Sequence, residues 1–216
     1  MKKLKTETDV LEVEHPAYRQ GGTDRAIAAL AQATHRLTMR RVRDMLPGKI
    51  ETRRLVLRAP MRGDVPDLIR LADNKIIAER LANFPSPYTR ADAIGFVEIF
   101  AQRADHRPYA ITSDGHLIGV IGFSYEEGAP PQLGYWLGEP HWGKGYMTEA
   151  GRALIDAAHR THQYDLILAR ALEANTASLR VLEKLGFHRA SKAKTRRAQT
   201  GDHPLALLEL ERPRWM

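Results

Sequence analysis

The sequence contains no cysteine, so disulfide bonds, thiolate zinc sites, iron–sulfur clusters and a cysteine nucleophile are excluded. It also lacks an apolar run of the roughly 18–20 residues that a membrane-spanning helix needs. No apolar stretch follows the N-terminal lysines, and several acidic residues come soon after them, so we expect neither a secretory signal nor a mitochondrial transit peptide. We therefore expect a cytoplasmic protein, without contact to a membrane and without a metal site.

Net positive charge is missing from the middle of the chain, although the 216 residues together carry a formal charge of +7. Residues 1–50 hold 10 Lys and Arg against 6 Asp and Glu, and residues 188–216 hold 7 against 3. Residues 51–187 hold 16 against 17. A basic protein suggests a nucleic-acid partner, but this charge lies outside the predicted core and is not interleaved with aromatic residues. We do not expect nucleic-acid binding, and a ribosome- or RNA-associated protein that uses its basic termini stays the alternative.

Residues 1–49 form a predicted N-terminal extension with one accessory helix near residues 24–46. Asp24 fits the N-cap position, apolar residues recur after it at helical spacing, and Pro47-Gly48 ends the pattern. We expect this helix to pack either on the domain or on a second subunit, so a homodimer is possible. The alternative is a basic arm for an acidic partner, which rests only on Arg36, Arg40, Arg41 and Arg43.

Residues 50–216 form the predicted compact domain. The pattern predicts strands over 53–58, 109–111, 117–123, 133–137, 166–171, 187–190 and 205–210. It predicts one or two helices over 64–82, with Asp64 as the N-cap, and further helices over 92–103, 147–160 and 176–185. Ser113-Asp114-Gly115 is a strong hairpin signal between two of the strands. Strands dominate early and helices alternate with strands later, which indicates an α+β (mixed α/β) fold with helices packed on one sheet.

A loop with two glycines lies between a predicted strand and a predicted helix. Gly143, Lys144 and Gly145 follow the strand that ends at Leu137, and the helix begins just after them. The first turn of a helix has unpaired N–H groups and a partial positive charge, and glycine lets the backbone approach an anion closely. The loop does not fit the P-loop pattern or the dinucleotide fingerprint, because Thr148 stands where the latter needs glycine. Such a loop alone is weak support for phosphate binding, since many similar loops only turn the chain.

The segment NTASLRVLEKLGF at 175–187 reads as a second helix with defined ends. Asn175 fits the N-cap, and Ser178 lies three residues on, on the same helical face. Gly186 suits the left-handed position after the helix. Taken alone, Asn175 would be a cap and Ser178 a solvated helix residue.

The two segments together resemble the GNAT superfamily of acetyl-CoA-dependent N-acetyltransferases, and more closely its ribosomal-protein-alanine acetyltransferase branch (RimJ/RimL-like). The resemblance covers about residues 50–210. The matching segments are TRRLVLR at 52–58, PYTRADA at 87–93, LIGVIGF at 117–123, LGYWLGEPHWGKGYMTEA at 133–150 and NTASLRVLEKLGF at 175–187.

The resemblance implies an acyl-CoA N-acyltransferase fold: a central, mostly antiparallel, twisted sheet of about six to seven strands, splayed near strand 4 and flanked by helices. It also implies that pantetheine pairs with backbone groups of Trp136 and Leu137, and that the pyrophosphate binds chiefly to backbone N–H groups. The implied pyrophosphate contacts are Trp142, Gly143, Lys144, Gly145, Tyr146, Met147 and Thr148. Met147 stands where the family has a small residue.

The implied reaction is direct attack of a neutral primary amine, from a protein N-terminus or a small molecule, on the thioester of acetyl-CoA. Ser178 matches the residue that protonates the leaving thiolate, and Asn175 matches the Asn that contacts pantetheine or an ordered water. Many relatives have a Glu where this chain has Gln132, so the general base is open: Glu126, Glu127, Glu139 or a water relay. The same replacement motivates an alternative, a protein that binds CoA without catalysis. Glu149 reads as a residue that braces the N–H groups of the phosphate loop rather than one that acts on the substrate.

Overall fold

The computed structural model describes residues 20–81, 84–162, 164–190 and 204–212. The chain divides into two units, residues 1–34 and 35–216, and helix α1 (Gln20–Met45) crosses the division. Part of the basic C-terminal cluster and residues 1–19 of the extension lie outside the described residues. In the larger unit, Met39 and Val42 of α1 pack on the core, and Arg43 donates hydrogen bonds to the backbone carbonyls of Gln102 and Arg103. Leu30 and Leu37 are exposed.

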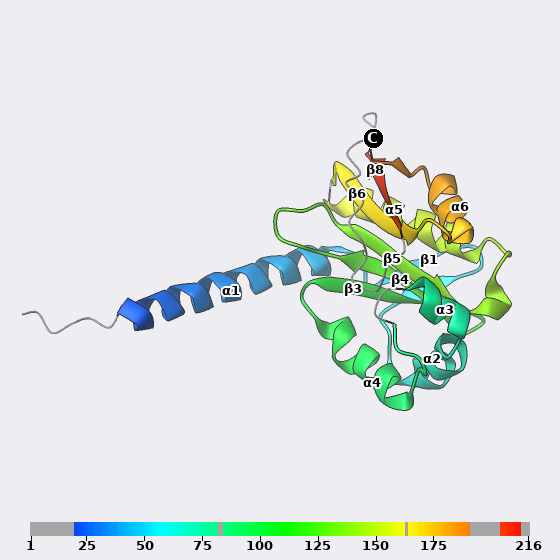
Figure 1. Cartoon of the computed structure of the whole chain (residues 1–216), viewed down its shortest axis with the longest axis horizontal. Coiled ribbons are helices and arrows are strands. Elements are labelled where there is room, and N and C mark those ends of the chain that lie inside the picture. Colours follow the sequence, from blue (N-terminus) through cyan, green and yellow to red (C-terminus); the bar gives the residue numbers. More distant parts are fainter. Residues whose placement is uncertain (1–19, 82–83, 163, 191–203, 213–216) are drawn as a thin grey trace, which may run out of the picture. The chain divides into compact units, whose positions relative to one another are not determined.

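The larger unit contains one eight-stranded sheet with helices on both faces (Figure 1). The strands are β1 (Lys49–Glu51), β2 (Val56–Arg58), β3 (His106–Ser113), β4 (His116–Ser124), β5 (Gln132–Leu137), β6 (Leu166–Leu172), β7 (His188–Arg189) and β8 (Leu205–Glu211). The helices are α2 (Val65–Ala72), α3 (Lys75–Arg80), α4 (Arg90–Glu98), α5 (Tyr146–His162) and α6 (Thr176–Lys184), with short 3-10 segments at Arg62–Asp64, Phe100–Gln102 and Glu139–His141.

The strand order is β1-β2-β3-β4-β5-β6-β8-β7, and every neighbouring pair is antiparallel except β5 with β6. The predicted hairpin is confirmed: Asp114 has φ 50° and Gly115 has φ 83°, the two positive values that a tight two-residue turn needs. The sheet has one strand more than expected, because β1 was not predicted. The expected strand over 53–58 is shorter, because Arg53 and Arg54 form a bend before β2.

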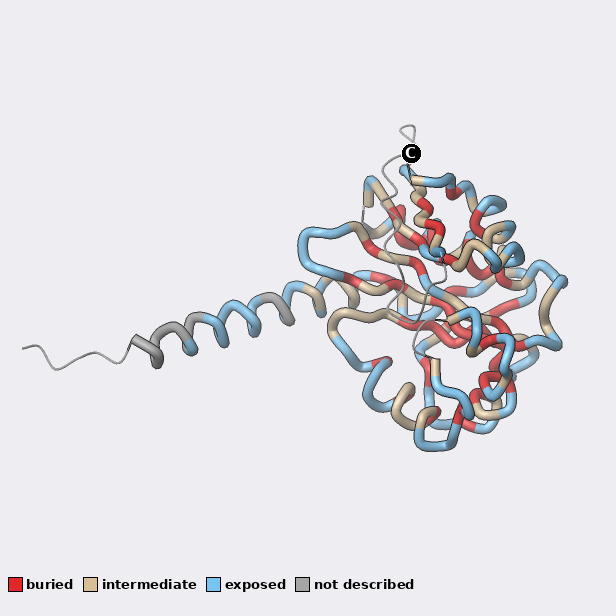
Figure 2. The backbone as a smooth tube through the Cα atoms, in the orientation of Figure 1, coloured by how far each residue is buried: buried red, intermediate tan, exposed pale blue. Residues whose placement is uncertain are grey.

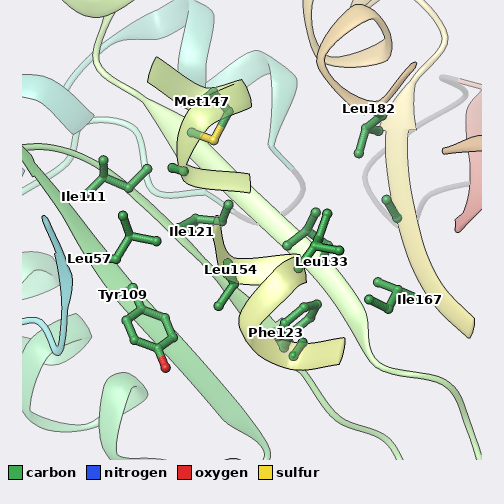
Figure 3. Packing of buried hydrophobic residues seen from close by; sticks show 14 of the residues in the cluster. Leu57, Tyr109, Ile111, Ile121, Phe123, Leu133, Met147, Leu154, Ile167 and Leu182 are labelled. Atoms are coloured by element: carbon green, nitrogen blue, oxygen red, sulfur yellow. The ribbon is translucent and has the colours of Figure 1, made fainter. Parts of the chain in front are cut away.

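Two buried clusters lie on opposite faces of the sheet, as the alternation of side chains along a strand requires. One cluster joins Ile111, Ile121 and Leu133 to α5 and α6, and Figure 3 shows Leu154 and Leu182 of these helices pointing towards the strands. The other cluster packs α2 and α4 on the opposite face. Figure 2 shows the buried segments concentrated in the strands between these layers. Helices packed on both faces therefore hold the sheet that carries the strand ends and loops of the candidate site.

Two expected N-caps are wrong, and each has a physical reason. Asp24 lies inside α1, which begins at Gln20. Asp64 precedes α2 but makes no capping bond, because its buried carboxylate binds the Arg58 guanidinium at 2.6 and 2.8 Å and accepts from the Met61 N–H. A charged partner that approaches from β2 outcompetes the helix N–H groups for this carboxylate.

Candidate active site

The sheet opens between β5 and β6. These strands are paired only at Gln132 with Leu168 and at Leu133 with Ala169. Strand β5 nevertheless pairs with β4 as far as Leu137, and β6 pairs with β8 along its whole length. Within the described chain, residues 134–137 therefore have no β6 partner on their open side, which confirms the splay expected at this strand.

The hydrogen-bond alternation of β5 decides which backbone groups face the opening. The Gly138 N–H donates to Ile118 at 2.9 Å, and every second residue of an antiparallel strand repeats that direction. The backbone of Trp136 therefore faces β4, whereas the N–H and C=O groups of Tyr135 and Leu137 face the opening. Of the two residues expected to pair with pantetheine, only Leu137 is so placed. Tyr135 takes the position expected for Trp136.

The glycine loop adopts the conformation that an anion site needs. Gly143 has φ 74° and Gly145 has φ 77°, in the left-handed region that other residues rarely enter. The first helical bond of α5 runs from the Glu149 N–H to the Gly145 carbonyl. The N–H groups of Tyr146, Met147 and Thr148 consequently precede the helical hydrogen bonds and point out of the first turn. The loop lies at the same end of β5 as the opening.

The side chains of Trp142, Tyr146 and Met147 turn inward, whereas Lys144 is exposed. The Trp142 indole N–H donates to the Leu137 carbonyl at 2.6 Å, and Trp142 and Tyr146 pack partly on the core. Met147 is buried with 6% exposure, and its side chain points into the core (Figure 3). A large residue at position 147 therefore leaves its own backbone N–H accessible. Gly143, Lys144 and Gly145 are exposed.

Glu149 links the glycine loop to the bend before β2. Its carboxylate accepts from the Thr52 hydroxyl at 2.7 Å, from the Arg54 N–H at 3.0 Å and from Arg54 Nε at 2.7 Å. Arg54 in turn donates to the Lys144 carbonyl at 3.0 Å and lies 4.5 Å from the Tyr146 ring centre. Burial opposes ionisation of Glu149, but the hydrogen bonds from Thr52 and Arg54 outweigh it and lower its pKa. Glu149 thus holds the loop indirectly, through Arg54, whereas the sequence led us to expect direct contacts with the loop N–H groups.

Ser178 and Asn175 come together with a third residue, Tyr135, on the α6 side of the sheet. The Asn175 side chain accepts from the Ser178 N–H at 3.2 Å, which confirms Asn175 as the N-cap of α6. The Tyr135 hydroxyl lies 2.9 Å from Ser178 Oγ and 3.2 Å from the Ser178 carbonyl. Burial is the main reason why the pKa of Tyr135 rises to about 12. No local sequence pattern indicates this contact, because only the packing of α6 on β5 creates it.

The carboxylates considered as a base lie in different surroundings. Glu126, Glu127 and Glu139 are exposed, and Glu139 accepts from the Asn74 side chain at 2.6 Å. Gln132 is half-buried at the start of β5. No carboxylate among these is held against Tyr135 or Ser178 by a described hydrogen bond.

A basic cleft of about 710 Å³ adjoins the glycine loop. It runs from Tyr146 past the bend before β2 to the β3–β4 turn. Its lining includes Lys49, Arg53, Arg54 and Arg58, of which three form ion pairs with acidic residues. Among the described residues, Arg53 makes no ion pair, so its positive charge is the one that an anion in this cleft meets unneutralised.

Comparisons with known proteins agree with this geometry. Residues 54–188 match the family described as acetyltransferase (GNAT) domain. The probable N-acetyltransferase YjcK of Bacillus subtilis is 41% identical over 85 residues, which cover 38% of this chain and 47% of that protein. The ribosomal-protein-serine acetyltransferase of Escherichia coli is 29% identical over 141 residues, which cover 62% of this chain and 78% of that protein.

A solved structure of RimL, a ribosomal L7/L12 alpha-N-protein acetyltransferase in complex with coenzyme A, has a TM-score of 0.67 at 22% identity. The similarity covers 76% of this chain and 97% of that one. Since the family match extends over more than half of the sequence, the chain belongs to the GNAT acetyltransferase family, and its mixed sheet flanked by helices is the GNAT fold. The chain spans about half the length of several curated relatives that it matches.

Among the described residues, no helix is both long and apolar enough to cross a membrane. No group of three or more histidine, cysteine or acidic side chains is placed there to share a metal ion.

Proposed function

We propose that the protein transfers the acetyl group of acetyl-CoA to a primary amine. The observation that supports this most directly is a continuous track along β5: the N-terminus of α5, the unpaired edge at residues 134–137, and the Ser178 hydroxyl. The three parts match in order the pyrophosphate, the pantetheine and the thioester of one extended ligand. The co-substrate thus fits the site by hydrogen-bonding capacity at each point.

We infer that the phosphates lie on the N–H groups from Gly143 to Thr148, with Lys144 close by. These groups carry the partial positive charge of a helix N-terminus. Pantetheine then adds to the free edge of β5 as an extra strand, and pairs with backbone groups of Tyr135 and Leu137. A backbone N–H on this edge also faces the thioester oxygen and stabilises the charge that develops there.

The chemistry is direct attack of a neutral amine on the thioester carbonyl. The amine nitrogen forms a bond to the acetyl carbon, the carbon–sulfur bond breaks, and the electron pair of that bond goes to sulfur. The proton that the nitrogen loses ends on sulfur. Ser178 donates to the departing sulfur, and Asn175 fixes the first turn of α6 that carries Ser178. Glu149 is not the base, because Thr52 and Arg54 occupy its carboxylate.

Calorimetry with acetyl-CoA, followed by a thiol-release assay over a panel of amines, tests this function. Because the chain has no cysteine, every thiol detected belongs to CoA. We expect binding together with release of CoA for at least one amine class. A folded protein that gives no heat of binding at tens of micromolar would refute the proposal. Binding without release across the panel would favour the alternative, a CoA-binding protein without catalysis, for which Gln132 is the supporting observation.

Replacement of Ser178 by Ala separates its role from cofactor binding. We expect the turnover number to fall at least about tenfold, as for the loss of a positioned proton donor, with little change in the affinity for acetyl-CoA. Unchanged turnover would remove Ser178 from the mechanism.

The proposal also covers the class of the acceptor amine, the oligomeric state of the protein and its location in the cell. An N-terminal peptide and a polyamine in the panel distinguish the two acceptor classes. Light scattering on the full chain tests a homodimer, for which the exposed Leu30 and Leu37 of α1 are the supporting observation. We keep the cytoplasmic location expected from the sequence, and we propose no nucleic-acid partner. RNA binding that weakens steeply with salt would contradict the latter.

A further inference from the structure

The contact between Tyr135 and Ser178 joins the opened strand to the helix across from it. Tyr135 comes from β5 and Ser178 from the first turn of α6, 43 residues apart in the chain. The phenol oxygen is 2.9 Å from Ser178 Oγ and 3.2 Å from the Ser178 carbonyl oxygen. One hydroxyl therefore lies within reach of two acceptors on a single residue.

Proton counting leaves two arrangements, because a phenol has one hydrogen to donate. In the first, Tyr135 donates to the carbonyl of Ser178, and Ser178 donates its own hydrogen to Tyr135. In the second, Tyr135 donates to Ser178 Oγ, and the hydrogen of Ser178 is directed elsewhere. Only the second arrangement leaves Ser178 able to donate to a sulfur atom in the opening.

Two arguments favour the second arrangement. The contact with Oγ is shorter than the contact with the carbonyl, and the position of Ser178 inside α6 (Thr176–Lys184) assigns its carbonyl to the helical N–H four residues on. A negatively charged sulfur attracts the hydrogen of Ser178, and a chain of hydroxyls that all donate in one direction strengthens each bond in it. The half-buried phenol, whose pKa burial raises to about 12, stays protonated near neutral pH and is therefore a donor in either arrangement.

We propose that Tyr135 is a positioning residue: it donates to Ser178 Oγ and thereby directs the hydroxyl hydrogen of Ser178 to the sulfur of CoA. No proton leaves Tyr135 in this arrangement. The carbon–sulfur bond breaks as in the proposed function, on which this inference rests, and the hydroxyl pair stabilises the negative charge that sulfur gains. Tyr135 itself does not touch the acetyl group and acts only through Ser178.

The ionisation of the CoA thiol, bound to the full chain, tests the proposal without an acceptor amine. Thiolate absorbance is followed against pH, and the complex with desulfo-CoA, which has no thiol, corrects for the ionisation of tyrosines. The chain contributes no thiol of its own. We expect Tyr135→Phe to raise the pKa of the bound thiol by about 0.5 to 1, the size of one hydrogen bond to a charged acceptor that is lost in part.

Two further variants distinguish positioning from a structural role. Ser178→Ala should raise the pKa of the thiol at least as much, and Tyr135→Phe combined with Ser178→Ala should raise it no further, because Tyr135 acts through Ser178. Tyr109→Phe is the matched control: it removes another buried tyrosine hydroxyl, which donates to the Pro47 carbonyl. That variant is expected to lower thermal stability and to leave the pKa of the thiol unchanged.

Each outcome has one meaning. A pKa of the thiol that is unchanged in Tyr135→Phe overturns the proposal. A pKa that falls overturns it too, since this is the sign expected when Ser178 donates to Tyr135 and is freed by the substitution. Additive shifts in the double variant show that Tyr135 acts independently of Ser178. Failure of the unaltered protein to bind CoA refutes the proposed function itself, which is a separate result from binding with no response to Tyr135→Phe.

Discussion

Alanine substitutions at glycines with positive φ measure how the glycine loop is used. Gly143, Gly145 and Gly115 have φ values of 74°, 77° and 83°. An L-residue in the left-handed region costs about 1–2 kcal/mol relative to glycine. Gly143 and Gly145 lie in the proposed phosphate site. Gly115 lies in the β3–β4 turn and is the matched control with the same backbone conformation.

Local packing adds little to this cost. A Cβ atom at Gly143 or Gly115 meets no described atom within 4 Å, and a Cβ atom at Gly145 lies 3.6 Å from an Arg54 side-chain nitrogen, an ordinary contact. Backbone strain is therefore the whole perturbation. If each variant keeps its native φ, the free energy of unfolding falls by about 1–2 kcal/mol, and Tm falls by about 2–8 °C for a chain of this length.

The glycine loop can also respond to the substitution by changing its conformation. Such a change affects ligand binding in the loop, whereas in the β3–β4 turn it does not. If residue 145 relaxes to negative φ, stability is kept, but the N–H groups are re-aimed and the ligand must restore the strained loop. The affinity for acetyl-CoA then falls by up to about 5- to 30-fold, the equivalent of the same 1–2 kcal/mol. The stability loss and the binding loss of Gly145→Ala, or of Gly143→Ala, should therefore together account for about 1–2 kcal/mol.

Thermal unfolding of the free protein and calorimetry with acetyl-CoA measure the two parts. Gly115 also lines the basic cleft, but it lies outside the glycine loop, so Gly115→Ala is expected to lose stability and to leave the loop's contribution to binding unchanged. Gly145→Glu is expected to abolish binding, because it adds a carboxylate to the proposed phosphate site. If Gly145→Ala unfolds at the same temperature as the unaltered protein and binds acetyl-CoA with the same affinity, the reasoning about this loop is refuted.

Three further predictions concern charged groups. Glu149→Gln should lower the free energy of unfolding by about 1–2 kcal/mol at neutral pH. Because the folded-state pKa of Glu149 is lowered, the difference in unfolding free energy between the variant and the unaltered protein should be constant above pH about 4.5 and should vanish as pH falls through the folded-state pKa. A difference that persists in acid contradicts this. We propose that the basic cleft takes the 3′-phosphate of CoA, because Arg53 is its charge without an ion pair among the described residues. Arg53→Ala should then weaken acetyl-CoA binding about threefold to fivefold, as for an exposed charge pair, and leave the binding of acetyl-dephospho-CoA unaffected; equal losses for the two ligands in calorimetry would contradict this placement. Asp64→Asn should lower the free energy of unfolding, measured with denaturant, by about 3–5 kcal/mol, because it leaves the partly buried Arg58 guanidinium without its carboxylate. A decrease of less than about 1 kcal/mol would show that the ion pair is solvated.

Local sequence chemistry sufficed where the structural cause is local. The Asp114-Gly115 turn needs only two residues that tolerate positive φ, and both have it. The Asn175 cap and the left-handed Gly186 that follows α6, with φ 93°, are likewise set within a few residues. The glycine loop is of the same kind, because strand, glycines and helix are contiguous. These features could therefore be predicted from the residues themselves.

Long-range contacts could not be predicted, because no local pattern encodes the partner. Asp64 was expected to cap a helix and instead binds Arg58. Trp136 was expected to face the opening with its backbone, but the register with β4 directs that backbone to the neighbouring strand, and its ring meets Phe84 on the far face, with centres 6.1 Å apart. The Tyr135 contact with Ser178 depends on how α6 packs on the sheet. Register and packing, rather than propensity, decide these positions.

The position of the positive charge bears on how the phosphates are held. Arg54 lies beside the glycine loop, but Glu149 neutralises it through a contact of 2.7 Å. The positive potential at the loop therefore comes mainly from the N–H groups of α5 and from Lys144, an exposed side chain that solvent screens. Arg54 acts through its fixed position, because its hydrogen bond to the Lys144 carbonyl holds the loop in shape. A site built in this way needs little net charge in the surrounding domain, which agrees with the near-neutral composition of residues 51–187.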